Sequence, residues 1–341
     1  MNPHTLGDPL TFALIDATAG PSPDCPAESR YATPIANTPL ICHVFDELAK
    51  TGIRQARIIA APSVSEDLGR ALGQGGSRGI VVTYVNTPVV DSRHLVLAEL
   101  ELALSQQPVL LHPGDCLFGS QLKDMHERFS TGDVDSVLPA QASVGSRRDS
   151  ADRRLSDTVV VLGPGTRPLF GDLLSSTRQE DDLIETLLHS DCRLAVCEQT
   201  EHWYYSDSTE DLLAANRMML DSLPALPCET DFSDDNQLQG RVHISPAACV
   251  SNCVVHGPVS IDAHAVVEDS FIGPYTSIGP DTILCGTEID NSMVLKGAEV
   301  RHPGSRIEAS IIGERARVIR SFALPKGLHL RLGSDSRVTF S

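Results

Sequence analysis

The 341-residue sequence is poor in aromatic and in basic side chains. Phe, Trp and Tyr make up 4% of the chain, with a single Trp and five Tyr, so any cluster of them is informative. Lys and Arg number 27 against 45 Asp and Glu, which leaves a formal charge of -18. Because this charge repels phosphate backbones and anionic lipid headgroups, the composition argues against nucleic acid and membrane surfaces as partners.

Long apolar runs and paired metal-binding cysteines are also lacking. No run reaches the roughly 20 residues that a membrane-spanning helix requires. The segment Met1–Asp16 has neither the basic nor the apolar region of a secretory signal, so we expect a cytoplasmic protein with reduced thiols. Of nine cysteines, Cys249 with Cys253 and Cys192 with Cys197 lie closest together, but neither pair has C-x-x-C spacing. The sequence therefore does not predict structural zinc.

The chain is too long for one ordinary domain, and its apolar pattern changes near residue 225. Before this point, short apolar runs alternate with stretches that carry apolar residues at helical spacing. The predicted strands, buried on both faces, are 12–15, 56–60, 80–84, 109–111, 134–138 and 158–162; the predicted helices are 40–51, 66–72, 93–105 and 121–129. This alternation predicts a doubly wound, mostly parallel sheet over residues 1–225. Ligands bind beyond the carboxyl ends of such strands, after Ile15, Tyr84 and Leu111.

The second half of the chain has a different period. A helix is predicted over Ser208–Leu223, with Ser208 as its N-cap and Asp211 as the capping partner. Residues 226–239 are acidic and without apolar rhythm, as is typical of a linker. From 240 to 341, aliphatic residues recur about every six positions, among them Ile261, Val267, Ile272, Ile278, Leu284, Ile289, Leu295, Ile312, Val318 and Leu324. This period predicts a parallel β-helix of hexapeptide coils, with a bulging loop near 302–305.

Several motifs occur within this arrangement. The most specific are TPIANTPL at 33–40, PGD at 113–115, and Trp203 followed by DLLAANR at 211–217. In the second half, 267–279 and 306–313 continue the pattern. With these motifs the chain resembles the sugar nucleotidyltransferases, in particular the long form of glucose-1-phosphate thymidylyltransferase. The resemblance implies a Rossmann-like α/β domain followed by a left-handed β-helix.

The resemblance also implies nucleotidyl transfer, but several residues of this sequence differ from the family's active-site motifs. Such enzymes join a sugar 1-phosphate to a nucleoside triphosphate, which requires a glycine-rich cradle, cations and carboxylates that hold Mg²⁺. The cradle, Gly-Gly-x-Gly-Thr-Arg, aligns with a segment that opens on Asp16, and its arginine aligns near Ser22. The lysine of the Pro-Lys pair aligns with Arg30, while Thr87 and Ser92 replace the glutamine and glycine that admit the base.

The metal and sugar-phosphate positions depart as well. Asp115 matches the first metal-binding aspartate, but an ungapped alignment puts Tyr204 on a lysine and Tyr205 on the second aspartate. Asp207 replaces that aspartate only if the loop slips by two residues, and 140–157 has no counterpart of the Glu-Lys-Pro segment. Losing one such donor costs about 3 kcal/mol of transition-state stabilisation. We therefore expect a degenerate active site without a cofactor, with Mg²⁺ at Asp115 only if nucleotidyl transfer is retained.

The side chains left at the cleft are predicted to line one pocket for a neutral or cationic small molecule, within a specialised-metabolite pathway. Asp16, Asp115 and Tyr205 are the candidate catalytic residues, the two carboxyls sharing a proton as an acid and base pair. The candidate substrate-binding residues are Arg30, Cys116, His202, Trp203, Tyr204 and Asp207. Each also has a structural interpretation: Asp16 as a loop cap, Cys116 as a buried filler, and the tyrosines as replacements for a lost nucleotide.

Three alternatives stay open. One is an active thymidylyltransferase-like enzyme. Another is a non-catalytic subunit that assembles with an active relative or scaffolds another enzyme. Because β-helix coils offer flat aliphatic faces, we expect the chain to form a homo-oligomer, or a hetero-oligomer with an active relative. The third is acyl transfer by the β-helix, with a coil-edge histidine as the base; His243, His256, His264 and His302 are the candidates.

Overall fold

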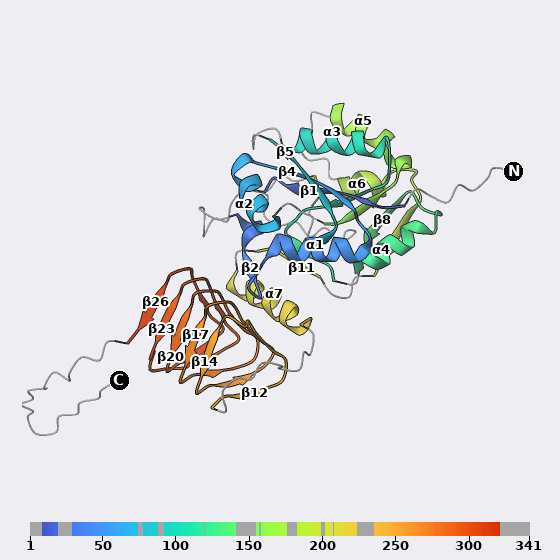
Figure 1. Cartoon of the computed structure of the whole chain (residues 1–341). Coiled ribbons are helices and arrows are strands. Elements are labelled where there is room, and N and C mark those ends of the chain that lie inside the picture. The colour runs from blue at the N-terminus through green and yellow to red at the C-terminus, as the bar shows by residue number, and fades with distance from the viewer. Residues whose placement is uncertain are drawn as a thin grey trace, which may run out of the picture.

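A computed structural model describes eleven stretches of the chain: residues 9–19, 29–73, 78–87, 92–119, 121–140, 155–156, 158–175, 183–198, 202–206, 208–223 and 235–320. They form an α/β part and a prism of stacked coils, and helix α7 (Thr209–Asp221) lies between the two (Figure 1). Among the described helices, none combines the length and the apolar character needed to cross a membrane.

The α/β part is built on a seven-stranded sheet of order β10-β8-β9-β6-β1-β4-β5. Its strands are β1 (Phe12–Ala17), β4 (Gln55–Ala60), β5 (Val81–Asn86), β6 (Val109–His112), β8 (Ser136–Pro139), β9 (Val160–Leu162) and β10 (Leu194–Cys197). Strand β9 runs antiparallel to both β6 and β8, and the other pairs are parallel. The predicted doubly wound, mostly parallel sheet is confirmed.

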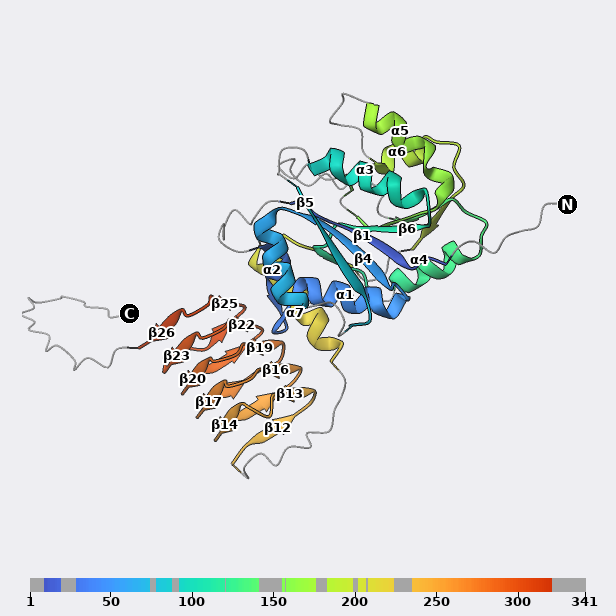
Figure 2. The ribbon, with the colours of Figure 1, turned by 45° about the horizontal axis from the view of Figure 1, so that its top comes forward.

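Helices cover both faces of this sheet (Figure 2). One face carries α1 (Leu40–Thr51), α2 (Pro62–Leu72) and α4 (Gln121–Ser130), and the other carries α3 (Ser92–Leu104), α5 (Pro168–Ser175) and α6 (Leu183–Leu188). Each face has its own cluster of buried apolar side chains. Shorter elements join them: η1 (Arg30–Ala32), the hairpin of β2 (Pro34–Ile35) and β3 (Thr38–Pro39), and η5 (Pro164–Thr166). A strand buried on one face by α1 and on the other by α3 must be largely apolar, as β1 is apart from Asp16 near its end.

One strand differs from the prediction. Residues 80–84 are predicted to be buried on both faces, but β5 is the edge strand and pairs only with β4. The Val81 side chain is consequently 66% exposed. An apolar run of β-branched residues looks the same at an edge and in the centre of a sheet, so the sequence could not distinguish them.

The C-terminal part consists of three five-stranded parallel sheets that form the sides of a prism. One sheet contains β12 (Gln237–Gln239), β15 (Val254–His256), β18 (Phe271–Ile272), β21 (Glu288–Asp290) and β24 (Ile307–Glu308). The second contains β13 (Val242–Ile244), β16 (Val259–Ile261), β19 (Thr276–Ile278), β22 (Met293–Val294) and β25 (Ile311–Ile312). The third contains β14 (Cys249–Ser251), β17 (Val266–Glu268), β20 (Ile283–Cys285), β23 (Glu299–Arg301) and β26 (Arg317–Ile319). This is the predicted left-handed parallel β-helix.

The six-residue period describes the interior of the prism well. Ile261, Val267, Ile272, Ile278, Leu284 and Ile289 are fully buried in its core. The prediction is wrong at Leu295, because Val294 fills the prism and Leu295 packs against the core of the α/β part. It is also wrong at Val318, which is 37% exposed, because β26 pairs only with β23 at the end of the described stack. Leu324 lies outside the described residues.

The predicted domain boundaries stay predictions. Strand β12 already pairs with β15, so the β-helix includes residues 237–239 of the segment assigned to the linker. Residues 226–234 of that segment lie outside the described part of the chain.

Two asparagines join the α/β part to the β-helix. Asn216 of α7, which is fully buried, accepts a hydrogen bond from the Ala36 amide (3.0 Å) and donates one to the Tyr275 carbonyl (3.1 Å). Asn37, next to Ala36 in the β2–β3 turn, donates to the Ser260 and Ile278 carbonyls at 3.3 and 2.9 Å. The β-helix therefore holds the hairpin that directly follows η1.

Replacing Asn216 with alanine is expected to lower the free energy of unfolding by about 1–3 kcal/mol, because it leaves one amide and one carbonyl at a buried junction without their partner. Urea unfolding of the full chain measures this. Arg217→Gln, which changes an exposed bond from the same helix to Asn291, is the matched control and should cost less. Equal effects of the two variants would contradict the assignment.

Candidate functional site

Three predicted site residues meet at the carboxyl end of the sheet. Arg30 of η1 and Asp115, three residues beyond β6, form an ion pair with 3.4 Å between Nη1 and Oδ2. Both side chains are buried, with the residues 8% and 2% exposed. The Arg30 guanidinium also lies 5.4 Å from the centre of the Tyr205 ring, and the Tyr205 amide donates to the Asp115 carbonyl (2.9 Å). The structure thus brings Arg30, Asp115 and Tyr205 into one cluster.

The turn that presents Asp115 depends on Gly114. This residue has φ of +78°, and a Cβ at its position would lie 3.1 Å from side-chain atoms of Ile15 and Tyr31. Glycine is the residue that adopts this conformation without steric cost. The Gly114 amide donates to Nδ1 of His112 (2.8 Å), which fixes the turn to the end of β6.

Asp16 lies at the end of β1, in register with Ile59 of β4, and is 1% exposed. Its Oδ1 accepts hydrogen bonds from the hydroxyl and the amide of Thr18, at 2.5 and 3.3 Å. In this arrangement Asp16 caps the following loop, which is the structural role considered for it in the sequence analysis. Asp16 and Asp115 therefore have different hydrogen-bonding neighbours, Thr18 and Arg30, and the proton shared between them stays a prediction.

The aromatic run forms a short strand beside Asp115. Strand β11 (Trp203–Tyr204) pairs antiparallel with β7 (Cys116–Leu117), so Tyr204 lies opposite Cys116. The Tyr204 hydroxyl lies 2.9 Å from Oγ1 of Thr158, and its ring meets Phe118 and His202 edge to face. Burial lowers the pKa of His202, which favours a neutral imidazole beside Tyr204.

Trp203 and Cys116 point into the core of the α/β part. The Trp203 indole donates to the Asp211 carbonyl at 2.8 Å, which ties β11 to the first turn of α7, and its ring meets Tyr205 at 6.0 Å. Cys116 is fully buried, with Sγ 3.9 Å from Nε2 of His112. Both side chains belong to the main apolar cluster. Their predicted contact with a ligand stays a prediction, and Asp207 lies outside the described residues.

The donors near Asp115 do not match an Mg²⁺ site. The ion prefers two or more carboxylate oxygens with retained waters, but here a guanidinium contacts the Asp115 carboxylate and a tyrosine ring lies beside them. Over the described ranges, no three His, Cys, Asp or Glu side chains are grouped as metal ligands. The described residues around Asp115 therefore do not by themselves supply an Mg²⁺ site, and the predicted loss of the metal stays a prediction.

Sequence reasoning missed four residues at this site. Tyr31 is fully buried and its hydroxyl accepts from the Ala19 amide (3.2 Å), while His112 and Thr158 contact Cys116 and Tyr204 as described above. The fourth, Glu47 of α1, is 9% exposed and accepts from the amides of Phe118 and Gly119, at 3.1 and 2.9 Å. Nothing in the sequence of α1, which also carries Asp46 and Lys50, distinguished Glu47 from a solvated acidic residue.

The candidate histidines of the β-helix have local contacts. The His256 ring packs against Phe271 at 5.3 Å, and Nε2 of His302 lies 3.8 Å from Sγ of Cys285. Acyl transfer by these residues stays a prediction.

Known proteins are similar to this chain over nearly its whole length. No family model matches the chain. It is 26% identical to a glucose-1-phosphate thymidylyltransferase from Streptomyces griseus, over 92% of this chain and 94% of that protein. A second protein of that name, from Streptomyces antibioticus, is 25% identical over 91% and 93%. The low-salt glycan biosynthesis nucleotidyltransferase Agl11 of Haloferax volcanii is 26% identical over 91% and 93%.

These alignments run through both the α/β part and the β-helix. With the mixed sheet, the β-helix and the motifs at 33–40 and 113–115, they define a nucleotidyltransferase fold. In both sequence and fold the chain is similar to the sugar nucleotidyltransferases.

Proposed function

We propose that this chain binds a small molecule in the nucleotide-sugar cleft of its fold and does not catalyse metal-dependent nucleotidyl transfer. The observation that carries the proposal is the buried ion pair between Arg30 and Asp115 beneath the Tyr205 ring. In the family pattern Asp115 is a metal ligand and Tyr205 occupies the position of the second one. A guanidinium in contact with that carboxylate supplies the charge balance that Mg²⁺ would otherwise supply.

The surroundings of this pair support the proposal. Asp16 places a second buried carboxylate at the end of β1, where the triphosphate cradle of the family begins. A carboxylate there repels an anionic triphosphate. Tyr204, Tyr205 and His202 offer aromatic surface and neutral polar atoms, which suit a neutral or cationic, partly apolar ligand.

A second candidate is an active sugar nucleotidyltransferase. What favours it is the match to enzymes of that name over more than nine tenths of the chain. The two candidates differ in one respect that can be measured, namely whether dTTP and Mg²⁺ bind together.

Calorimetric titration of the full chain with dTTP in the presence of Mg²⁺ is expected to show no binding, and glucose 1-phosphate with dTTP to release no pyrophosphate above background. Since removal of one donor lowers kcat by about 10²–10³, turnover should be at least about a thousandfold below that of the Streptomyces griseus enzyme assayed in parallel. Mg²⁺-dependent binding with pyrophosphate release would overturn the proposal. Binding of dTTP by the wild-type chain without turnover would also overturn the proposal if Asp115→Asn abolished that binding.

A further inference from the structure

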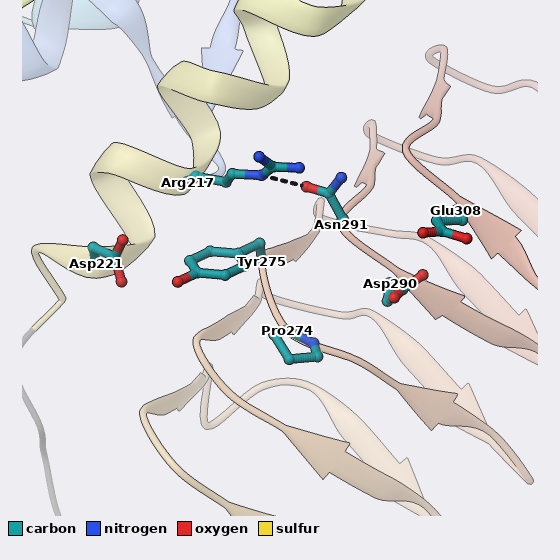
Figure 3. A pocket seen from close by; sticks show the side chains of 7 residues that line it. All are labelled: Arg217, Asp221, Pro274, Tyr275, Asp290, Asn291 and Glu308. Carbon is teal, nitrogen blue, oxygen red and sulfur yellow. Dashed lines mark hydrogen bonds between the residues drawn. The ribbon is translucent and has the colours of Figure 1, made fainter.

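A concave surface that shares no residue with the Asp115 cluster lies between α7 and the β-helix. It is a groove of about 450 Å³. Arg217 and Asp221 of α7 line one side, and Tyr275, Asp290, Asn291 and Glu308, from successive coils, line the other. Figure 3 shows the Tyr275 ring extending from its coil toward α7, with Asn291, Asp290 and Glu308 on one side of it. Arg217, Tyr275 and Glu308 lie in motifs that carry the family resemblance, but none of them is among the nucleotide, metal or sugar-phosphate positions discussed above.

The groove has an apolar floor. The Tyr275 ring and Pro274 provide it, and the Arg217 guanidinium lies 5.9 Å from the ring centre. Tyr275 adopts φ of +61° and its carbonyl accepts from the buried Asn216, so the backbone that carries the ring is fixed. Because Arg217 already occupies the cation position over this ring, a second cation is disfavoured there.

Donors and acceptors alternate around this floor. Arg217 Nε donates to Oδ1 of Asn291 (2.7 Å). The Asn291 amide nitrogen and the two outer guanidinium nitrogens take no part in this bond and can donate to a ligand. Asp290 and Glu308 face each other in register on β21 and β24 and supply acceptor oxygens. Both Asp290 oxygens also accept from Arg306, which offsets the repulsion between the two carboxylates.

The groove and its immediate partners are close to neutral. Arg306 pairs with Asp290, with 3.3 Å from Nε to Oδ1, and Arg241 pairs with Asp221 at 2.5 Å. With Arg217 these cations balance the three carboxylates that line the groove. A strongly anionic ligand, such as a nucleotide, and a polycation therefore gain little from this surface.

We propose that this groove is a binding site for a neutral, polyhydroxylated ring, that is, a pyranose sugar or a glycoside. Each sugar hydroxyl both donates and accepts, which matches the alternation of Asn291, Arg217, Asp290 and Glu308, and the C–H face of the ring stacks on Tyr275. The site is separate from the Asp115 cluster and does not depend on what that cluster binds.

The test uses D-glucose as the probe and the full chain as the protein. Saturation-transfer difference NMR is expected to show binding, with a Kd on the order of 1 mM, since a ligand of about twelve heavy atoms gains roughly 0.3 kcal/mol from each. Cyclohexanol, which has a ring but not the array of hydroxyls, should bind at least about tenfold more weakly.

Variants locate the site. Tyr275→Leu keeps an apolar side chain but removes the ring, and Glu308→Ala changes an exposed residue that the fold does not need. Each should weaken glucose binding by about fivefold or more at unchanged thermal unfolding. His202→Ala, at the Asp115 cluster, is the control and should leave Kd unchanged. The proposal would be overturned by any of three results: no saturation-transfer signal at 20 mM glucose, equal Kd in all variants, or loss of binding in His202→Ala alone. Loss of binding in His202→Ala alone would place the sugar near Asp115, in the site discussed under the proposed function.

Discussion

Replacing Arg30 with methionine is expected to destabilise the α/β part by about 3–5 kcal/mol, because the Asp115 carboxylate is left buried without its guanidinium. Both residues are less than a tenth exposed, so water cannot readily replace the lost partner. Methionine preserves an unbranched apolar stem against Tyr205, which separates the loss of charge from a loss of packing. The free energy of unfolding, from urea titration, is the measurement.

Two further variants test this explanation. Arg30→Met combined with Asp115→Asn removes the buried carboxylate charge as well and should recover most of the lost stability. Arg70→Met removes a surface ion pair in which the Arg70 side chain is 74% exposed, and should cost no more than about 1 kcal/mol. If the double variant were no more stable than Arg30→Met alone, the buried charge would not be the cause.

The fold was largely predictable because its periods are local. Helix α1 covers the predicted residues 40–51, and Ser208 caps α7 by accepting from the Asp211 amide (3.3 Å). In the β-helix each coil repeats the requirement for one buried aliphatic per side, so many coils report the same period. Predictions failed at the edge strand β5, at Val318 in the last described coil, and at Leu295, which packs against the α/β part.

The candidate site was predictable in position but not in its contacts. The residues after β1 and β6 do gather at one end of the sheet, as a parallel topology requires. The ion pair of Arg30 with Asp115, however, joins residues that are far apart in sequence. No local pattern encodes such a contact.

The same reason hid Glu47. In the sequence it follows Asp46 in an amphipathic helix, and a solvated position on the outer face is the usual interpretation of such a residue. In the structure it lies against the loop after β7 and accepts from the amides of Phe118 and Gly119, two residues that follow Cys116 and Leu117 closely. Its carboxylate therefore joins α1 to the segment that pairs with the aromatic strand β11.

Glu47 is expected to make the chain lose stability as the pH rises from about 4.5 to 7. Burial raises the pKa of its carboxyl from 4.5 to about 7, against the opposing effects of the two amides and of Lys50. Between these values the folded protein keeps a proton that the unfolded chain releases, so the free energy of unfolding falls across the window and levels off above it. The loss attributable to Glu47 is about 3 kcal/mol.

Glu47→Gln isolates this effect, because glutamine has the shape and the neutral charge of the protonated carboxyl. Urea unfolding of both proteins between pH 5 and 8 should show the variant gaining on the wild type as the pH rises, by up to about 3 kcal/mol near pH 8. His43, whose pKa burial lowers, favours the folded state at higher pH, but it is present in both proteins and cancels in the comparison. A constant difference across this range would show that the Glu47 carboxyl titrates alike in the folded and unfolded chains. The two amides would then balance its burial completely.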